Sequence, residues 1–413
     1  MVTPHSSDDV GISEPRPSRL VVGVVVVLGF LAATYTAYLW MRYLVSIDIA
    51  GTVGARAGRD FRAFAVAGSL ADAGNVSDLY DPSAASYVAA DASAFVYPPW
   101  FAASMIPISM ASFQTGYWIW LSATSALAAA SLVLVDRRFG FAAFGALLAS
   151  AAGLQTMLFG QSAFLILALG GVVAWAVAAR RHLVAGSAAA LMAFKPQLLL
   201  GLAIVWVWKR DRFGRSIIAA LALSSVLYVG SEMLLSGSWF GWATVIANSS
   251  SGLVAPTAEI TLGSAARLLV GEGVLGDALV VGFVLGGVVW LATVLHRRDL
   301  EDGTLLFAAF GMSIVVSLHA LLYDVLVLVP ALLIIWAARP AMRFRVTVYG
   351  VATISLLTIG PIAVAAQLEV FGRAVAVGPL ALAAFVVWLV EAVPRHSRSV
   401  GQARDGIPEP AGG

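Results

Sequence analysis

Long apolar stretches recur along almost the whole length of this chain. Twelve of them are separated by short polar connections, at residues 20–45, 112–135, 139–155, 162–179, 183–195, 197–208, 215–235, 275–295, 303–318, 321–337, 345–366 and 374–393. A helix of about 20 apolar residues can cross the hydrocarbon core of a bilayer. Inside lipid a helix satisfies its own backbone hydrogen bonds. The pattern therefore predicts an all-α integral membrane protein, a polytopic bundle of about 12 transmembrane helices.

Two of these stretches leave the count open. Residues 183–195 and 197–208 are short and meet at Lys195 and Pro196, so they form either two tilted spans or one broken helix. Residues 100–110 and 262–270 are apolar but too short to cross, and we expect re-entrant or interfacial segments there.

Composition agrees with the membrane class. Hydrophobic residues make up 60% of the chain and charged residues only 12%, whereas soluble domains are about 25% charged. The net charge of +2 is small and dispersed, so the sequence gives no reason to expect a nucleic acid partner. Cysteine is absent, which excludes disulfides and thiolate chemistry.

The basic residues set the expected orientation. With 12 spans, 18 of the 25 Lys and Arg residues fall on one side of the membrane, and short loops rich in Lys and Arg stay in the cytoplasm. Residues 1–18 and 395–413 are then disordered cytoplasmic tails, and 19–394 form a single membrane domain. The first extracytoplasmic loop, 46–111, is expected to contain short surface helices and to face outward at the cell membrane.

Polar residues gather at the outward ends of the predicted spans, as a single site assembled from many segments would require. They include Asp60, Tyr80, Tyr97, Gln161, Lys195, Gln197, His319, Tyr323 and Asp324. Asp60 precedes Phe61, Phe64 and Ala67 at helical spacing. Its carboxylate could act as a general base on a hydroxyl group, or it could simply cap the helix.

Lys195 is flanked by apolar residues, and a charge at that depth normally has a partner. The partner could be a phosphate, or the lysine could extend its ammonium group to the membrane surface. Gln161 could hydrogen-bond a ligand or cap the following helix. On a continuous helix His319 and Tyr323 would share a face. These buried polar groups serve either a ligand site or a structural pair between helices.

Several chemistries lack the residues they need. The chain has no Walker loop, no HExxH motif, no nucleotide-binding glycine pattern and no DxD pair. We therefore expect no cofactor, no metal ion and no nucleotide-sugar donor.

The motifs GRDF, LYDP, F-x-YPP, GQ, FKPQ and H-x-x-x-YD occur in this order between residues 58 and 324. Because of these motifs and their order, the chain resembles glycosyltransferase family 87, whose members are membrane enzymes of the GT-C type. The resemblance implies that Asp60 is the general base and that Lys195 and Gln197 lie near the donor phosphate. It also implies that His319, Tyr323 and Asp324 line the same cavity. From their positions beside these motifs, Gln161 is expected to bind the donor, and Tyr80 and Tyr97 to line the cavity.

The resemblance further implies a polyprenyl-phosphate sugar as donor, with mannose as the expected sugar and inversion at its anomeric carbon. A glycolipid or glycan would be the acceptor, reached at the extracytoplasmic face. Two other functions remain open on the sequence. One is a transporter or flippase for lipid-linked glycans, and the other is a polymerase or ligase of such glycans.

Overall fold

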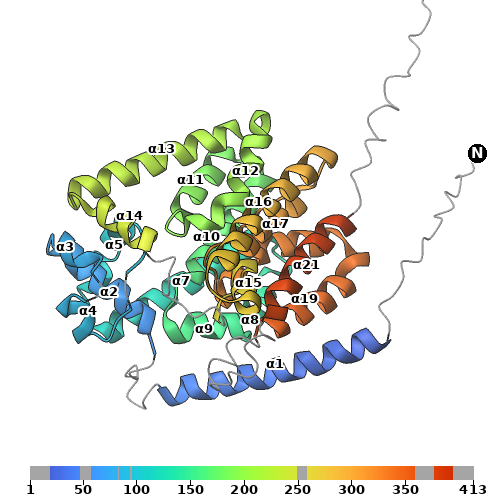
Figure 1. Ribbon diagram of the computed structural model, residues 1–413, viewed down its shortest axis with the longest axis horizontal. Helices are drawn as coiled ribbons and strands as arrows, with labels where there is room; N and C mark the ends of the chain where they lie inside the picture. The colour runs from blue at the N-terminus through green and yellow to red at the C-terminus, as the bar shows by residue number, and fades with distance from the viewer. Residues whose placement is uncertain are drawn as a thin grey trace, which may run out of the picture.

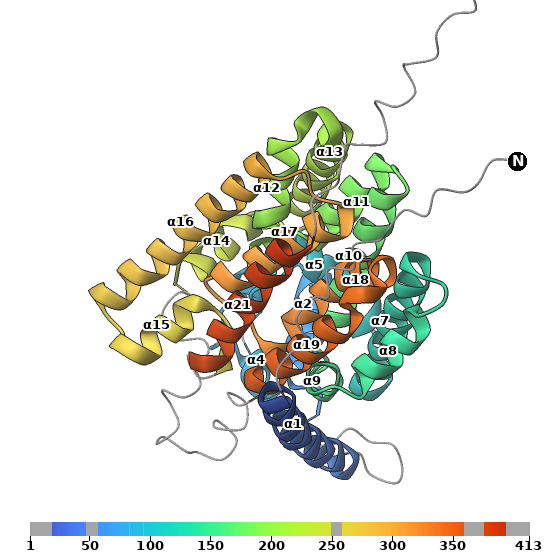
Figure 2. The same ribbon diagram turned by 90° about the vertical axis from the view of Figure 1, so that its right-hand side faces the viewer.

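Helices form all the regular secondary structure in the described part of the chain, apart from one antiparallel bridge between Glu259 and Leu321. The computed structural model describes residues 19–46, 57–81, 83–93, 95–248, 258–358 and 376–393. Figures 1 and 2 show the helices packed around a central group, with α1 along one side.

The first half of the chain gives one long helix, a set of short ones and then the start of the bundle. These elements are α1 (Arg19–Ser46), α2 (Arg59–Asp72), α3 (Val76–Leu79), α4 (Ala85–Ala89), α5 (Pro99–Ser104), α6 (Ile106–Ser109), α7 (Phe113–Val135), α8 (Gly140–Leu148), α9 (Ala151–Phe159), α10 (Ala163–Ala178), α11 (His182–Met192), η1 (Pro196–Leu199) and α12 (Leu200–Trp208).

The second half completes the bundle. It consists of α13 (Arg210–Leu234), α14 (Ser238–Asn248), α15 (Leu262–Val270), α16 (Val274–Arg297), α17 (Asp302–Val316), η3 (Leu322–Leu328), α18 (Val329–Ala338), η4 (Pro340–Met342), α19 (Arg343–Leu357) and α21 (Val377–Ala392).

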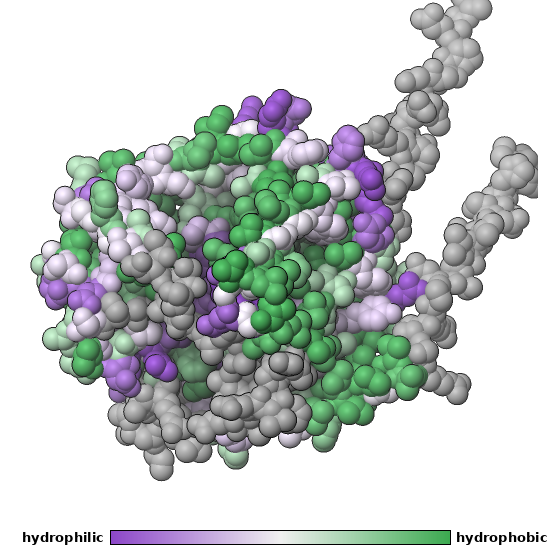
Figure 3. All heavy atoms as spheres, viewed as in Figure 1, coloured by the Kyte–Doolittle hydropathy of each residue, from purple (hydrophilic) through white to green (hydrophobic). Residues whose placement is uncertain are grey.

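Two helices lie at the centre. Every residue of α17 from Gly303 to Val316 is buried, and α10 is buried on nearly all sides. A helix that is apolar all round belongs inside a bundle. α10 packs against α7, α11 and η3, and α17 packs against α12, α16, α18 and α21. The surface of the molecule is consequently made by the outer helices. Figure 3 shows apolar residues over α15, α16 and α21 on one face.

The helices confirm the membrane prediction in part. Four are long and apolar enough to cross a bilayer, namely Leu20–Met41, Phe113–Val135, Arg210–Leu234 and Val274–Arg297. Two bent pairs raise the number to six if each pair is one span, and five further apolar helices are shorter. The chain is therefore a helical protein of multi-pass membrane character. The number of 12 spans stays a prediction.

One predicted span differs in shape. Residues 139–155 are not one helix but α8 and α9, which meet at an angle of 68°. The cause is local, because the Ser150 hydroxyl accepts a hydrogen bond from the Gly153 N–H at 3.1 Å and so starts a new helix. The break predicted at Lys195 and Pro196 is present, and it separates α11 from α12 by η1.

The short helices predicted for the first loop are confirmed within its described residues. α2, α3 and α4 lie with α14 at the left end of the molecule in Figure 1. The N-terminal end of α1 and the C-terminal end of α21 lie at the opposite end. Among the described residues, the first-loop helices and these two helix ends therefore lie on different sides of the bundle. The identity of each side remains the expectation given by the basic residues.

Ion pairs join the helix ends away from α2. Arg212 pairs with Asp302, and Lys209 pairs with Asp299 at 3.6 Å. Two further pairs lie on this face, Arg298 with Glu391 and Arg339 with Glu301. These contacts connect the ends of α12, α13, α16, α17, α18 and α21. We call this surface the ion-pair face.

A glycine sets the closest approach between the central helix α17 and its neighbour α12. A Cβ atom on Gly201 of α12 would lie 2.0 Å from the carbonyl oxygen of Ala309 in α17. The Gly201 N–H also donates a hydrogen bond of 2.8 Å to the Ser313 hydroxyl. The two backbones touch here, as small residues allow in membrane bundles.

We predict that Gly201→Ala lowers the thermal unfolding midpoint, because α12 must move away from α17. Such overpacking costs about 1–3 kcal/mol. Gly214→Ala is the control, since a Cβ atom there meets nothing within 4 Å and alanine favours a helix. Thermal unfolding in detergent measures both. Equal midpoints for the two variants would contradict the close contact.

Candidate active site

Asp60 is the second residue of α2, and its side chain does not cap the helix. Gly58 occupies the N-cap position with φ of 69°. The Gly58 N–H donates a hydrogen bond of 2.7 Å to the carbonyl oxygen of Leu158 in α9. The start of α2 is thereby attached to the end of α9. The capping interpretation of Asp60 is wrong, and its carboxylate is available for other contacts.

Two side chains from distant segments hold the Asp60 carboxylate. The Gln161 amide Nε2 donates to Oδ2, and the Ser93 hydroxyl donates to Oδ1 at 3.4 Å. Gln161 follows Gly160, whose φ of 69° ends α9 in a left-handed turn. The Trp120 indole N–H donates to the Gly160 carbonyl at 3.0 Å. This fixed turn places the Gln161 amide on the carboxylate.

Burial raises the pKa of Asp60 above its ordinary value. The opposing influences, in order, are hydrogen bonds and positive charges from Gln161, Arg59, Ser93 and Lys195. Desolvation disfavours the charged carboxylate, whereas donors and cations favour it. The balance is a carboxyl group that takes up a proton more readily than an aspartate in water. A raised pKa is what a general base near neutral pH needs.

Lys195 and Asp324 form a buried ion pair. The Lys195 ammonium lies 2.7 Å from Oδ1 of Asp324, and the two side chains are 8% and 2% exposed. Oδ2 of Asp324 accepts a hydrogen bond of 2.9 Å from the Leu321 N–H. The ammonium also lies 4.9 Å from the centroid of the Tyr323 ring. Lys195 is thus not extended to the membrane surface, and its protein partner is a carboxylate.

Tyr97 interacts electrostatically with Asp60 and with the Lys195–Asp324 pair. Burial raises the pKa of Tyr97; the charge on Lys195 lowers it, whereas Asp60 and Asp324 raise it further. The ring packs against Phe64 and Phe101, at 5.2 and 5.0 Å between centroids. The Tyr97 ring also packs against Phe194, which precedes Lys195, at 6.0 Å between centroids. Tyr97 therefore lies between the helix that carries Asp60 and the segment that carries Lys195.

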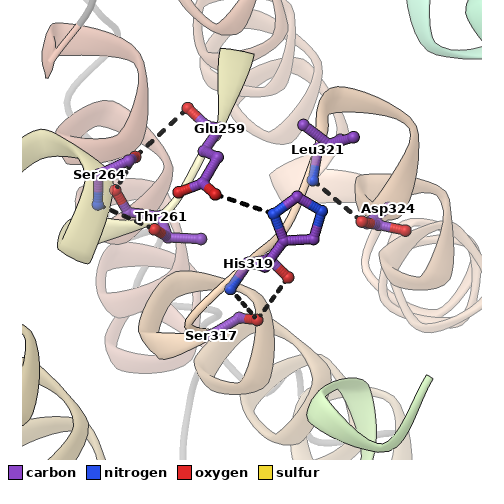
Figure 4. Close-up of polar contacts among 7 residues, drawn as sticks. All are labelled: Glu259, Thr261, Ser264, Ser317, His319, Leu321 and Asp324. Atoms are coloured by element: carbon purple, nitrogen blue, oxygen red, sulfur yellow. Dashed lines mark hydrogen bonds and ion pairs between the residues drawn. The ribbon is translucent and has the colours of Figure 1, made fainter. Parts of the chain in front are cut away.

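His319 and Glu259 form a second polar contact (Figure 4). Nδ1 of His319 lies 2.8 Å from Oε1 of Glu259, with the imidazole 44% exposed and the carboxylate 8% exposed. Leu321 joins this contact to the ion pair, because it bridges to Glu259 and donates its N–H to Asp324. The sequence interpretation missed Glu259. The available signal was a carboxylate between residues 236 and 274, where acidic residues are few.

The prediction that His319 and Tyr323 share a helix face is wrong. α17 ends at Val316 and η3 begins at Leu322, so His319 lies in the non-helical link between them. The Ser317 hydroxyl donates to the His319 carbonyl at 2.7 Å and accepts from its N–H at 3.1 Å. A serine that bonds the local backbone competes with the helix ladder. Figure 4 shows this turn below the imidazole.

The other two candidates have different surroundings. Tyr80 is buried; its hydroxyl donates to the Tyr97 carbonyl at 3.1 Å, and its ring packs beside Phe95. It therefore supports the loop that carries Tyr97. Gln197 is partly buried in η1 and makes none of the contacts above. Within the described ranges, no three His, Asp or Glu side chains are grouped as metal ligands would be.

The arrangement combines a base, a cation and hydrogen-bond donors. Asp60 can accept a proton, and Gln161 fixes its orientation. Two of the three ammonium protons of Lys195 remain for a ligand if Asp324 takes one. Such a set suits a reaction in which a hydroxyl loses a proton and an anion departs.

Comparison with protein families finds a match. The family model described as Glycosyltransferase family 87 matches residues 95–323. This range includes Gln161, Lys195, His319 and Tyr323 but begins after Asp60. No curated protein and no solved structure matches the chain.

The buried ion pair makes a prediction about stability. Lys195→Met and Asp324→Asn should each lower the thermal unfolding midpoint, because each leaves one buried charge without its partner. That loss costs about 3–5 kcal/mol. The double variant should lie nearer the wild type than the sum of the singles predicts. Thermal unfolding of all four proteins completes the cycle, and additive effects would show that the pair is not coupled.

Proposed function

The chain belongs to glycosyltransferase family 87, and we propose that it transfers a mannosyl group from a polyprenyl-phosphate donor to a glycolipid or glycan acceptor. The reaction takes place at the extracytoplasmic membrane face and inverts the anomeric carbon. The single observation that carries this proposal is the Asp60 carboxylate, which Gln161 and Ser93 hold in the same region as the Lys195 ammonium.

The proposed step is a direct displacement. An acceptor hydroxyl attacks the anomeric carbon while Asp60 takes its proton. The bond from that carbon to the phosphate oxygen breaks, and the oxygen leaves with the electron pair. The products are a glycosidic bond, a protonated Asp60 and a polyprenyl phosphate. A base on one side of the sugar and a cation on the other fit this geometry.

Lys195 is proposed to meet the phosphate without leaving Asp324. The carboxylate neutralises most of its charge, so the ammonium contributes directed hydrogen bonds more than net attraction. The Tyr323 ring at 4.9 Å limits where the ammonium can move. His319, held by Glu259 and partly exposed, is proposed to line the same region.

The lipid part of the donor also has a place in this proposal. A cavity of about 620 Å³ lies between α1 and the bundle. Val325 and Leu326, directly after Asp324 in η3, line it, together with apolar and small residues of α1, α19 and α21. We assign the start of the polyprenyl chain to this cavity, because an isoprenoid needs apolar walls next to its phosphate.

We predict that Asp60→Asn lowers the transfer rate by about 10²–10⁴-fold, since the amide cannot accept the proton. The measurement is sugar transfer by purified protein in detergent, with labelled polyprenyl-phosphate mannose and a membrane glycolipid extract. A transporter would show no turnover there, because detergent leaves no sealed compartment.

Asp72→Asn is the matched control, since Asp72 ends the same helix and is exposed. It should retain wild-type activity, and donor binding should survive in both variants. An Asp60→Asn enzyme as active as the Asp72→Asn enzyme would falsify the proposed base.

A second prediction concerns pH. Because burial raises the pKa of Asp60, kcat/KM should fall on acidification through a pKa above the usual aspartate value of about 3.9. The Gln161 amide favours the charged carboxylate, so Gln161→Leu should move this acidic limb to still higher pH. The pH profile of kcat/KM tests the shift.

Gln155→Leu provides the comparison, because Gln155 is also buried and lies in α9 but is not bonded to Asp60. Its acidic limb should coincide with that of the wild type. A limb that stays in place in Gln161→Leu would show that Gln161 does not tune the base.

A further inference from the structure

Two arginines near the ion-pair face lie against one aromatic ring. Several cations of this face have a carboxylate partner, as Arg212 has Asp302. Arg138 and Arg343 have no carboxylate within ion-pair distance among the described residues. Both instead lie against the ring of Phe139, at 5.4 and 5.6 Å from its centroid.

The two guanidinium groups are held in place. Nε and Nη2 of Arg343 donate to the carbonyls of Trp336 and Ala337, at 2.9 and 3.3 Å. The same group lies 4.5 Å from the centroid of the Trp336 ring. These contacts attach Arg343 to the end of α18 and leave part of its donor fork unused. Arg343 is therefore an ordered cation at this surface.

Arg138 is presented by a fixed turn. The Asp136 carboxylate accepts hydrogen bonds from the backbone N–H groups of Arg138 and Phe139, at 2.8 and 3.0 Å. This carboxylate is engaged with the backbone, and the exposed Arg138 side chain extends past it over the ring. Two like charges on one ring repel each other. Since both lie against Phe139, their guanidinium carbons are no more than 11.0 Å apart, and an anion that contacts both would reduce the repulsion and accept several N–H donors.

Two exposed rings indicate what kind of anion fits. Phe141 lies three residues after Arg138 and is 73% exposed, and Phe344 directly follows Arg343 and is 56% exposed. Exposed apolar rings close in sequence to two cations match an amphiphile, with a charged head and a hydrocarbon tail. Free phosphate would gain nothing from the rings. Aromatic side chains are common where protein meets the boundary between lipid and water.

We propose that Arg138, Arg343 and Phe139 form a binding site for the phosphodiester headgroup of an anionic phospholipid, with Phe141 and Phe344 against its acyl chains. Guanidinium groups bind phosphate through paired hydrogen bonds. Basic pockets between helices at a membrane surface bind acidic lipid headgroups. The site is separate from the Asp60 region, and its occupant is not consumed by sugar transfer.

The test uses the full chain, purified in detergent and freed of lipid. Native mass spectrometry titrates phosphatidylglycerol, phosphatidylcholine and inorganic phosphate. Phosphatidylglycerol should bind more tightly than the other two probes. Arg138→Gln should weaken its binding about fivefold, and adding Arg343→Gln should weaken it about 25-fold. Phe141→Ser should weaken phosphatidylglycerol binding and leave inorganic phosphate unchanged.

Arg181→Gln is the matched control, because Arg181 lies over the single ring of Trp175 at 5.1 Å. Phosphatidylglycerol binding should be unchanged in this variant. The site is refuted if Arg138→Gln binds phosphatidylglycerol as the wild type does, or if phosphatidylcholine binds as tightly. Equal affinity for inorganic phosphate would overturn the lipid assignment. Should the double variant unfold, Arg138→Gln alone decides, since its charge is exposed.

Discussion

The buried ion pair between Lys195 and Asp324 is the constraint on which the site depends. Neither charge could remain at that depth alone, because an unpaired buried charge costs several kcal/mol. The pair joins the η1 break to the start of η3, segments 129 residues apart. Both breaks interrupt apolar stretches that would otherwise continue as helix. The free backbone groups at these breaks are then available near a polar region, which membrane proteins tolerate where backbone lines a site.

The helices and much of the site could be predicted from the sequence. Each apolar stretch contains helix, and the surface helix at Asp60 has Phe61, Phe64 and Ala67 buried as their spacing indicated. Helical periodicity and hydropathy are local properties, so a single sequence shows them. The break at Pro196 was equally local. The number of membrane crossings was less accessible, since several helices are shorter than a bilayer requires.

The contacts between site residues were harder to predict from the sequence than the site residues themselves. Lys195 and Asp324 were each recognised as unusual, but nothing in the sequence showed that they bond to each other. Glu259 was missed because it lies outside the apolar stretches, where scarcity of acidic residues is the one signal and no spacing accompanies it. His319 was placed on a helix that Ser317 ends, and a side chain bonding its own backbone leaves no periodic signal. Pairing is a property of the folded chain, whereas composition and spacing belong to the linear one.

The bond from Gln161 to Asp60 has a consequence for biosynthesis. Its two ends are separated by 101 residues, so the ribosome has completed α2 long before it makes the glutamine. During that interval the carboxylate lacks its main donor, and the nascent protein holds an aspartate with no fixed orientation. The Lys195–Asp324 pair is completed later still, because Asp324 follows Gln161 in the chain. The order of synthesis therefore sets the order of assembly, with the Asp60 carboxylate first, its amide donor second and the buried ion pair last.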